Sequence, residues 1–396
     1  MEHFSIVKAL GRAALAEDNR SVVAHQLDRL EAALRRSGDS DADALQKLIS
    51  TAAQPRRAAP TRVARSSANQ LERMAPGVPV PVDPESAAPL ATVVFPEQND
   101  AQQPVFNDAV TETVRSLTKE WEHQDQLFEA GLHPSLTALL YGPPGTGKTS
   151  LALWLAKELR LPAVVARLDG LISSLLGTTA RNLGTLFSFA NRYDCVLVLD
   201  EFDAIAKLRD DPNEVGEIKR VVNALLQNMD TRAMTGITLG LTNHETLLDP
   251  AVWRRFEVQV PIPVPAVPER TAIVKAAFGG AADSSDAEAK LIVWMTDGFS
   301  GAEVTTVCQK WRKRRIVDGT STADPAQLIM QVTASTAARF GSAERPEWPN
   351  REALIADLVR SVDVHFSQAD LAHLCGISTK TVGRLVSKIQ SEDSDA

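Results

Sequence analysis

YGPPGTGKTS (141–150) decides the fold of this 396-residue chain, because it fits the pattern G-x-x-x-x-G-K-[ST] at every fixed position. Glycines in such a loop let successive backbone N–H groups turn towards phosphate oxygens, and the following helix adds its positive N-terminal dipole. An apolar run (136–141) precedes the loop and a helical run (150–159) follows it. This context predicts a P-loop that binds a nucleotide. The expected nucleotide-binding residues are Gly142, Pro143, Pro144, Gly145, Thr146, Gly147, Lys148, Thr149 and Ser150.

Two adjacent carboxylates supply the second part of the predicted site. The run CVLVLDEFD (195–203) has the character of a buried parallel strand that ends in Asp200 and Glu201. We expect Asp200 and Thr149 to hold Mg²⁺, and Lys148 to neutralise the β- and γ-phosphates of ATP. Glu201 is placed to polarise the water that attacks the γ-phosphorus. An acidic pair alone is a weak signal, since carboxylates often cap the next helix, so this assignment depends on the P-loop.

A third strand-like run, GITLGLT (236–242), ends next to Asn243, and a double arginine follows at Arg254 and Arg255. Together with the P-loop, these motifs resemble the AAA+ ATPases. The resemblance implies that Asn243 helps to position the attacking water and that the arginines reach into the nucleotide site of a neighbouring subunit. A planar, permanently ionised guanidinium suits the charge that builds on a transferring phosphoryl group. The alternative is that two surface arginines merely precede a strand.

Two further segments are similar to the AAA proteins proper, near the meiotic, microtubule-severing and ESCRT-disassembling group. DPAVWRRF (249–256) follows the form LDxAxxRRF of that group, without the Pro-Gly insertion of its proteasomal relatives. TDGFSGAEV (296–304) resembles the motif that starts a lid helix and packs on the adenine, which assigns Gly301 and Ala302 to nucleotide binding. The resemblance extends over about residues 106–316. It implies a Mg²⁺-dependent ATPase that assembles as a hexamer and remodels, unfolds or delivers a partner protein.

The loop after the second strand of the core is expected to contact the protein substrate. AAA relatives carry an aromatic–hydrophobic–glycine triplet there, directed into the central pore of the ring. This chain has Leu175, Leu176 and Gly177, so the apolar pair and the glycine are present while the aromatic residue is missing. We interpret the triplet as a pore loop. The alternative is that both leucines belong to the core.

The predicted fold class is α/β, with a parallel P-loop sheet and additional helical parts. We expect a helical N-terminal module (1–53), a mobile Pro-rich linker (54–104), the large ATPase subdomain (105–265), a helical lid (266–343) and a helix-turn-helix-like domain (344–396). The linker assignment depends on frequent prolines and a lack of periodicity. The N-terminal module either selects a target or stabilises the oligomer.

The C-terminal segment FSQADLAHLCGISTKTVGRLVSKIQ (366–390) matches helix-turn-helix spacing, with Gly376 at the turn. In a DNA-reading protein its second helix would present Lys380, Thr381 and Arg384 to the major groove. Five basic and five acidic residues between 346 and 390 leave the segment neutral, which predicts weak DNA binding unless several copies act together. The alternative is a trihelical domain that docks a protein or is purely structural. A second basic stretch, KWRKRR (310–315), is expected to be a solvated helix face in the lid.

Composition limits the classes of function. The formal net charge of −8 favours solubility, no run of 18 apolar residues predicts a membrane span, and the N-terminus lacks signal-peptide character. Three separated cysteines predict a reducing cytoplasm and no structural metal. Two functions of different class remain: an energy-coupled protein remodeller, and a nucleotide-controlled DNA-binding assembly or regulator. The domain order also resembles bacterial ATPases encoded beside subtilisin-like proteases, which implies target delivery to a protease in antiviral defence.

Overall fold

The computed structural model describes residues 71–167, 171, 176–203, 215–232, 236–278, 286–318, 325–340, 348 and 350–394. All of them belong to Asn69–Ala396, the second of two compact units into which the chain divides. The predicted N-terminal module and residues 54–70 of the predicted linker lie outside the described residues. Among the described helices, none is both long enough and apolar enough to cross a membrane.

A six-stranded sheet with the order β1-β3-β4-β5-β2-β6 forms the centre of the large subdomain. Every neighbouring pair is parallel except β1 and β3, which are antiparallel. The mostly parallel α/β sheet predicted from the P-loop is thus confirmed, with an antiparallel edge strand added. The strands are β1 (Ala91–Val94), β2 (Thr137–Tyr141), β3 (Ala163–Ala166), β4 (Val196–Leu199), β5 (Thr238–Thr242) and β6 (Val258–Pro261).

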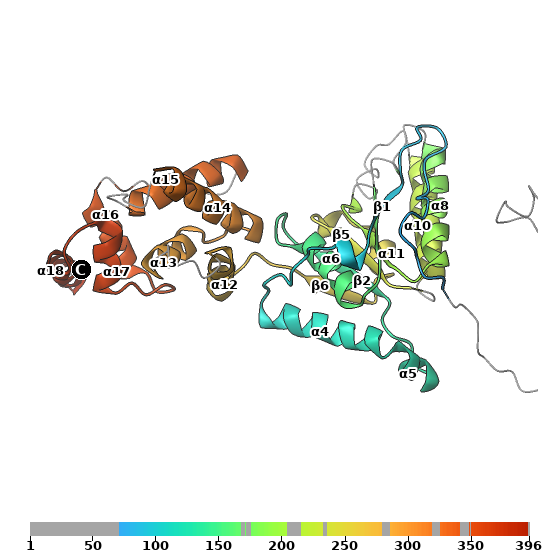
Figure 1. Cartoon of the computed structure of the whole chain (residues 1–396), viewed down its shortest axis with the longest axis horizontal. Helices are drawn as coiled ribbons and strands as arrows, with labels where there is room; N and C mark the ends of the chain where they lie inside the picture. The colour runs from blue at the N-terminus through green and yellow to red at the C-terminus, as the bar shows by residue number, and fades with distance from the viewer. Residues whose placement is uncertain are drawn as a thin grey trace, which may run out of the picture. The chain divides into compact units, whose positions relative to one another are not determined.

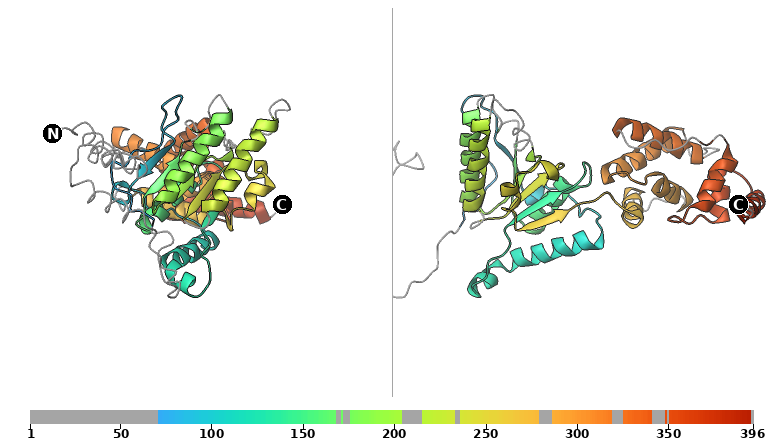
Figure 2. Two further views of the ribbon diagram at one scale, coloured as in Figure 1. Left: turned by 90° about the vertical axis from the view of Figure 1, so that its right-hand side faces the viewer. Right: turned by 180° about the vertical axis from the view of Figure 1, so that it is seen from behind.

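Helices cover both faces of the sheet, because the central strands are apolar on both sides. On β4, Leu197 and Leu199 join one core while Val196 and Val198 join the other. The first face carries α8 (Leu176–Arg192), α10 (Val215–Arg232) and α11 (Pro250–Trp253), with α8 and α10 side by side in Figures 1 and 2. The second face carries α4 (Asp108–Glu122), which leads into α5 (Gln124–Glu129), and α6 (Lys148–Glu158).

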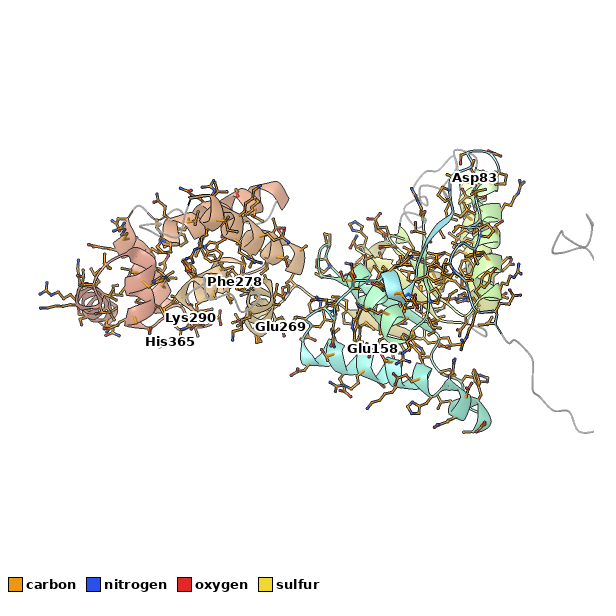
Figure 3. All side chains as sticks on the ribbon, in the orientation of Figure 1. Asp83, Glu158, Glu269, Phe278, Lys290 and His365 are labelled. Atoms are coloured by element: carbon orange, nitrogen blue, oxygen red, sulfur yellow. The ribbon has the colours of Figure 1, made fainter. Side chains whose placement is uncertain are left out.

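The predicted linker is wrong over residues 71–104, because these residues pack on the sheet domain. Leu90 and Ala91 are buried in the core, and β1 extends the sheet beyond β3. Asp83, labelled in Figure 3, is 2% exposed and accepts hydrogen bonds from Ser86 Oγ at 2.6 Å and from Asn182 of α8. The 3-10 turn η1 (Pro96–Gln98) follows β1. Prolines are tolerated beside an edge strand and in turns, where a missing N–H breaks no central ladder.

The predicted lid consists of α12 (Val267–Phe278), α13 (Asp286–Met295), α14 (Gly301–Asp318) and α15 (Pro325–Phe340), and α16 (Arg351–Arg360), α17 (Gln368–Cys375) and α18 (Thr379–Ser394) follow it. One apolar core runs through all of these helices. At the junction, the rings of Trp294 and Trp348 lie 5.8 Å apart, and Lys290 Nζ lies 2.9 Å from Asp370 Oδ2. The predicted boundary at residue 344 is therefore wrong as a division between cores. Apolar side chains of α17 pack against the lid instead of closing a separate domain.

Candidate nucleotide site

The P-loop connects β2 to α6, and its glycines have backbone geometry that other residues rarely adopt. Gly142, Gly145 and Gly147 have φ angles of 140°, 75° and 100°. A Cβ atom on Gly142 would lie 2.2 Å from the carbonyl oxygen of Ile262, so space excludes a side chain there as well. Gly147 precedes the first residue of α6. The loop therefore directs backbone N–H groups and a helix N-terminus at one place, as phosphate binding requires.

Lys148 is nearly buried at the start of α6, with 7% of its surface exposed. Its Nζ donates to the carbonyl oxygens of Gly142 at 2.8 Å and Pro143 at 2.7 Å. These bonds use two of the three donors of the ammonium and leave one for a ligand. Burial lowers the pKa of Lys148, and the negative charges of Asp200 and Asp203 partly oppose this shift. The cation is thus held against the loop by the same carbonyls that shape it.

Asp200 follows the last residue of β4 and is close to the P-loop. The Thr149 hydroxyl donates to Asp200 Oδ2 at 2.9 Å, and the Glu201 N–H donates to Asp200 Oδ1 at 2.9 Å. A threonine hydroxyl and a carboxylate are the oxygen donors that Mg²⁺ accepts beside phosphate oxygens, so this pair fits that ion. Glu201 is exposed and has a φ angle of +50°, a left-handed conformation that is uncommon outside glycine.

Most residues of the predicted site line one cavity of about 660 Å³. Its lining includes the P-loop from Pro144 to Ser150, both carboxylates, and Asn243, which directly follows β5. The other side of the cavity comes from the lid through Gly301 and Ala302 at the start of α14. Gly142 and Pro143 do not line it and contribute instead by holding Lys148.

A backbone hydrogen bond joins the lid to the P-loop. The Ala302 N–H donates to the carbonyl oxygen of Gly145 at 3.0 Å. Just before α14, Ser300 N–H and Oγ both donate to Glu303 Oε2 at 2.7 Å, so a short acidic cap fixes the helix start. A Cβ atom on Gly145 would meet Ser300 Oγ at 2.7 Å. The glycine therefore serves the close approach of the lid as well as the shape of the loop.

Sequence reasoning missed several residues of the cavity wall. Pro104 and Val105 line it from the predicted boundary between the linker and the large subdomain, and no local pattern marks them. On the lid, three of the missed residues follow Gly301 and Ala302 at helical spacing on α14, a periodicity that could have found them, and one lies on α12. A second cavity of about 700 Å³ shares Pro104 and Val105. The further missed wall residues are Ile273, Thr305, Thr306 and Gln309.

The two arginines differ in their surroundings, and neither lines the cavity of its own chain. Arg255 makes a two-pronged ion pair with Asp230 of α10, Nε to Oδ1 at 2.8 Å and Nη2 to Oδ2 at 3.2 Å. This hydrogen-bonded carboxylate raises the pKa of Arg255. Arg254 is exposed, and no hydrogen bond or ion pair of its side chain occurs within the described residues. The preceding Trp253 packs edge-on against Tyr141, 5.2 Å between ring centroids, so α11 is fixed beside the P-loop strand.

The remaining predicted site residues lie apart from the cavity. Leu175 is outside the described residues, and Leu176 and Gly177 form the beginning of α8, so the pore loop stays a prediction. Lys380, Thr381 and Arg384 are exposed on α18. The basic stretch 310–315 is largely engaged within the lid. Its hydrogen bonds join Lys310 to Thr336, Arg312 to the carbonyl of Ala277, Arg314 to Gln331 and Arg315 to Glu288.

Comparisons with known proteins show what the chain is similar to. Residues 138–264 match the family described as ATPase family associated with various cellular activities (AAA). The chain is 37% identical over 248 residues to an uncharacterized AAA family ATPase, y4kL, of Sinorhizobium fredii, a match that covers 62% of this chain and 72% of that protein. It is also similar to the crystal structure of the FIGL-1 AAA domain, with a TM-score of 0.49 and 24% identity, over 67% of this chain and 89% of that one.

Proposed function

The chain belongs to the AAA family of ATPases, and we propose that it forms a ring in which ATP hydrolysis drives the remodelling of a partner protein. Its relatives imply nucleotide binding with a divalent metal and ATP hydrolysis. The observation that carries the proposal is the cavity between the P-loop and α14, where Lys148, Asp200, Glu201 and Asn243 meet. The lid is hydrogen bonded to the P-loop, so its orientation is tied to the loop that holds the phosphates.

Ground-state binding would come from the P-loop. Its N–H groups and Lys148 neutralise the phosphates, while α14 and the Pro104–Val105 segment enclose the rest of the nucleotide. Thr149 and Asp200 would hold Mg²⁺, whose charge further neutralises the phosphates when it is bound. Lys148 therefore acts on both ground state and transition state, and its loss should abolish binding.

Hydrolysis would use Glu201 and Asn243. Glu201 takes the proton of the attacking water, and Asn243 orients that water from the end of the neighbouring strand β5. The backbone N–H of Glu201 donates to Asp200 Oδ1. This hydrogen bond holds the proposed base next to the carboxylate of the proposed metal site. Glu201 contributes mainly in the transition state, which makes its loss distinguishable from the loss of Lys148.

A ring of subunits would complete the site. Arg254 is exposed on the α11 side and does not line the cavity of its own chain, which suits a residue that acts on a neighbour's nucleotide. Arg255 is engaged by Asp230, so its expected role is to fix α11. We propose a hexamer, in which delivery of Arg254 from the next subunit couples hydrolysis to assembly.

The partner is proposed to be a protein that Leu175, Leu176 and Gly177 grip in the pore of this ring. The N-terminal module would select that target, and the finer proposal is its delivery to a protease in antiviral defence. The support for these roles is the sequence pattern alone. We place the enzyme in the cytoplasm, in keeping with the buried free thiols of Cys195, Cys308 and Cys375.

The proposal is tested with Glu201→Gln in the full chain. We expect this variant to bind ATP with nearly unchanged affinity, to lose hydrolysis, and to accumulate as an ATP-bound oligomer of six-subunit mass. Mass photometry measures the assembly and phosphate release measures turnover. Glu257→Gln, at an exposed carboxylate just before β6, is the matched control and should behave like the wild type.

Rapid ATP turnover by Glu201→Gln would contradict the proposed role of Glu201 in hydrolysis. A protein that hydrolyses ATP but stays monomeric at all concentrations would contradict the proposed ring. The same trapped oligomer can be used to capture the partner, because a substrate that enters an arrested ring is not released.

A further inference from the structure

The last helix of the chain, α18, presents one apolar and one basic face. Val382 and Ile389 are buried, and Leu385 and Val386 are half-buried beside them, so this face joins the lid core. The opposite face is exposed. It carries cations at four-residue spacing, which places them in one row along the helix: Lys380, Arg384 and Lys388.

Charge is segregated along the C-terminal segment, although its sum from 346 to 390 is zero. No acidic residue occurs between 371 and 391, and all five acids of the segment precede α18. Two of these acids are engaged: Asp370 with Lys290 of α13 at 2.9 Å, and Asp357 with Trp348 Nε1 at 2.7 Å. A count over the whole segment therefore hides a stretch, residues 371–391, that carries cations and no acid; Glu392 and Asp393 follow only in the last turn of α18.

The helix before α18 is fixed next to this basic face. Ser367 and Asp370 form a reciprocal cap at the start of α17, and Gly376, with a φ angle of 62°, ends the helix. Gln368, the first residue of α17, approaches α18 closely, because a Cβ atom on Gly383 would lie 3.5 Å from Gln368 Oε1. The N-terminal turn of α17 therefore lies beside the exposed first half of α18.

We propose that the basic face of α18 binds duplex DNA in the major groove, with Lys380 and Arg384 as its principal contacts. The helix has 16 residues and is about 24 Å long, and the major groove of B-form DNA, about 12 Å wide, admits a helix of this kind. The major groove of A-form RNA is too narrow for side chains to read, which selects DNA.

Thr381 also takes part in a helix cap. Its N–H donates to Ser378 Oγ at 3.1 Å, and the two hydroxyl oxygens lie 2.8 Å apart, so Thr381 takes part in capping α18. The proposed contact with DNA depends on the few cations of α18. Because phosphate contacts supply most of the affinity, one copy binds weakly and several copies in one assembly bind more tightly.

This surface goes beyond protein remodelling, since it would anchor the ATPase on DNA. The site shares a core with the lid, whose α14 is hydrogen bonded to the P-loop through Ala302 and Gly145. DNA held by α18 is therefore held by the part of the chain that contacts the nucleotide.

The test compares the full-length wild type with Lys380→Glu/Arg384→Glu, by fluorescence anisotropy on a labelled duplex of about 30 base pairs, roughly three helical turns. Lys275→Glu/Lys313→Glu is the matched control, because it makes the same charge change at exposed residues of α12 and α14. We expect the wild type and the control to bind at about 50 mM salt, and the α18 variant to bind about tenfold or more weakly. Its plot of log affinity against log salt should be flatter by about two.

Three results would overturn the proposal. They are no binding by the wild type at low salt in either ATP or ADP, an equal loss of affinity in the control variant, and equal affinity for an RNA duplex of the same sequence. Both substituted residues are exposed, so the variants should melt like the wild type, and a thermal scan verifies that they are folded. ATPase activity is measured on the same samples, which separates a failure of this surface from a failure of the ATPase site.

Discussion

A buried cation lies at each end of the parallel strands, which we call the carboxyl edge and the amino edge of the sheet. The two cations differ in whether they can still donate a hydrogen bond to a ligand. At the carboxyl edge, Lys148 bonds to two carbonyls of its own loop and lines the nucleotide cavity. At the amino edge, Arg232 is 0% exposed and donates to the carbonyl oxygens of Ala190 at 2.7 Å, Cys195 at 2.8 Å and Ile237 at 3.2 Å. Arg232 does not line that cavity.

The difference follows from the direction of the strands. In a parallel sheet the carboxyl ends of the strands lie at one edge, and the loops after them build the ligand site. At the other edge, Cys195 and Ile237 directly precede β4 and β5, and Arg232 ends α10. The guanidinium there bonds to carbonyls of α8 and of the residues before β4 and β5, one of which, Ile237 O, also accepts the Leu197 N–H at 3.0 Å. We infer that the first edge is built for binding and the second for stability.

The largest effect is expected at the carboxyl edge. Lys148→Ala removes the buried ammonium next to the phosphates, so ATP binding should become undetectable while the melting temperature stays near that of the wild type. Calorimetric titration with a nonhydrolysable ATP analogue measures the affinity. Lys119→Ala on α4, which removes an exposed ammonium, is the control and should bind normally. A folded Lys148→Ala protein with wild-type affinity would break the comparison.

The second effect concerns the hydrolysis step. Arg254→Ala should leave ATP binding nearly intact and lower the hydrolysis rate by about 10³-fold, as expected for an arginine supplied by a neighbour. Because the residue would act across an interface, mixing this variant with Lys148→Ala should restore part of the activity. Mixtures without any recovery, together with a rate per subunit that does not depend on protein concentration, would contradict the trans mechanism.

Arg255 sharpens that experiment. Its ion pair with Asp230 fixes α11 on α10, so Arg255→Ala should also lower hydrolysis but by displacing Arg254. Asp230→Asn weakens the same pair without touching either arginine. We expect it to reproduce a smaller version of the Arg255→Ala defect, and an unchanged rate in Asp230→Asn would separate Arg255 from this positioning role.

The third effect tests the amino edge. Arg232→Met should lower the free energy of unfolding by about 3 kcal/mol, because three buried carbonyls lose a charged hydrogen-bond donor. The KM for ATP should change little, since Arg232 does not line the cavity. Arg192→Met is the control: its pair with Glu72 is more than half exposed, so we expect less than about 1 kcal/mol. A large rise in KM in Arg232→Met, with little loss of stability, would reverse the roles of the two edges.

Backbone requirements explain why the carboxyl edge could be predicted from the sequence. Gly142 and Gly147 have positive φ angles, and a Cβ atom on Gly142 would meet a neighbouring carbonyl. These positions require glycine, so the glycines of the motif predict the conformation of the loop. The apolar run before Asp200 likewise predicts a strand that is buried on both faces. The positions of these residues in one cavity follow from the parallel sheet. Their chemical roles stay predictions.

Long-range packing explains what the sequence did not reveal. The prolines of residues 71–104 suggested a linker, yet Leu90 and Asp83 are buried by contacts with segments far along the chain. Arg232 is a polar residue on an amphipathic helix, and nothing local marks the carbonyls that surround it. In the same way, a neutral charge count could not separate the cations of α18 from acids that other elements engage. Such features depend on which surfaces pack together in the folded chain, and a local sequence pattern does not predict this packing.

The smallest effect is expected where the lid meets α17, and it extends the comparison to a cation that is only partly buried. Lys290 Nζ lies 2.9 Å from Asp370 Oδ2, with side-chain exposures of 32% and 14% (Lys290 is labelled in Figure 3). Lys290→Met should lower the free energy of unfolding by about 1 kcal/mol, since a partly exposed ion pair is screened by solvent. Lys313→Met, on the exposed face of α14, is the control.

The pH dependence of this effect has a definite sign. Partial burial opposes ionisation of Asp370, but hydrogen bonds from Lys290 and Ser367 outweigh it and lower the pKa below the ordinary value of 3.8. The stabilisation is therefore present above pH 3.8 and is lost as pH falls through the lowered pKa. We expect urea unfolding to give a constant difference between wild type and Lys290→Met from pH 7 to about 5, which narrows in more acidic buffers. A difference that stays constant on acidification would mean that Lys290 stabilises this junction through its aliphatic stem and not through its charge.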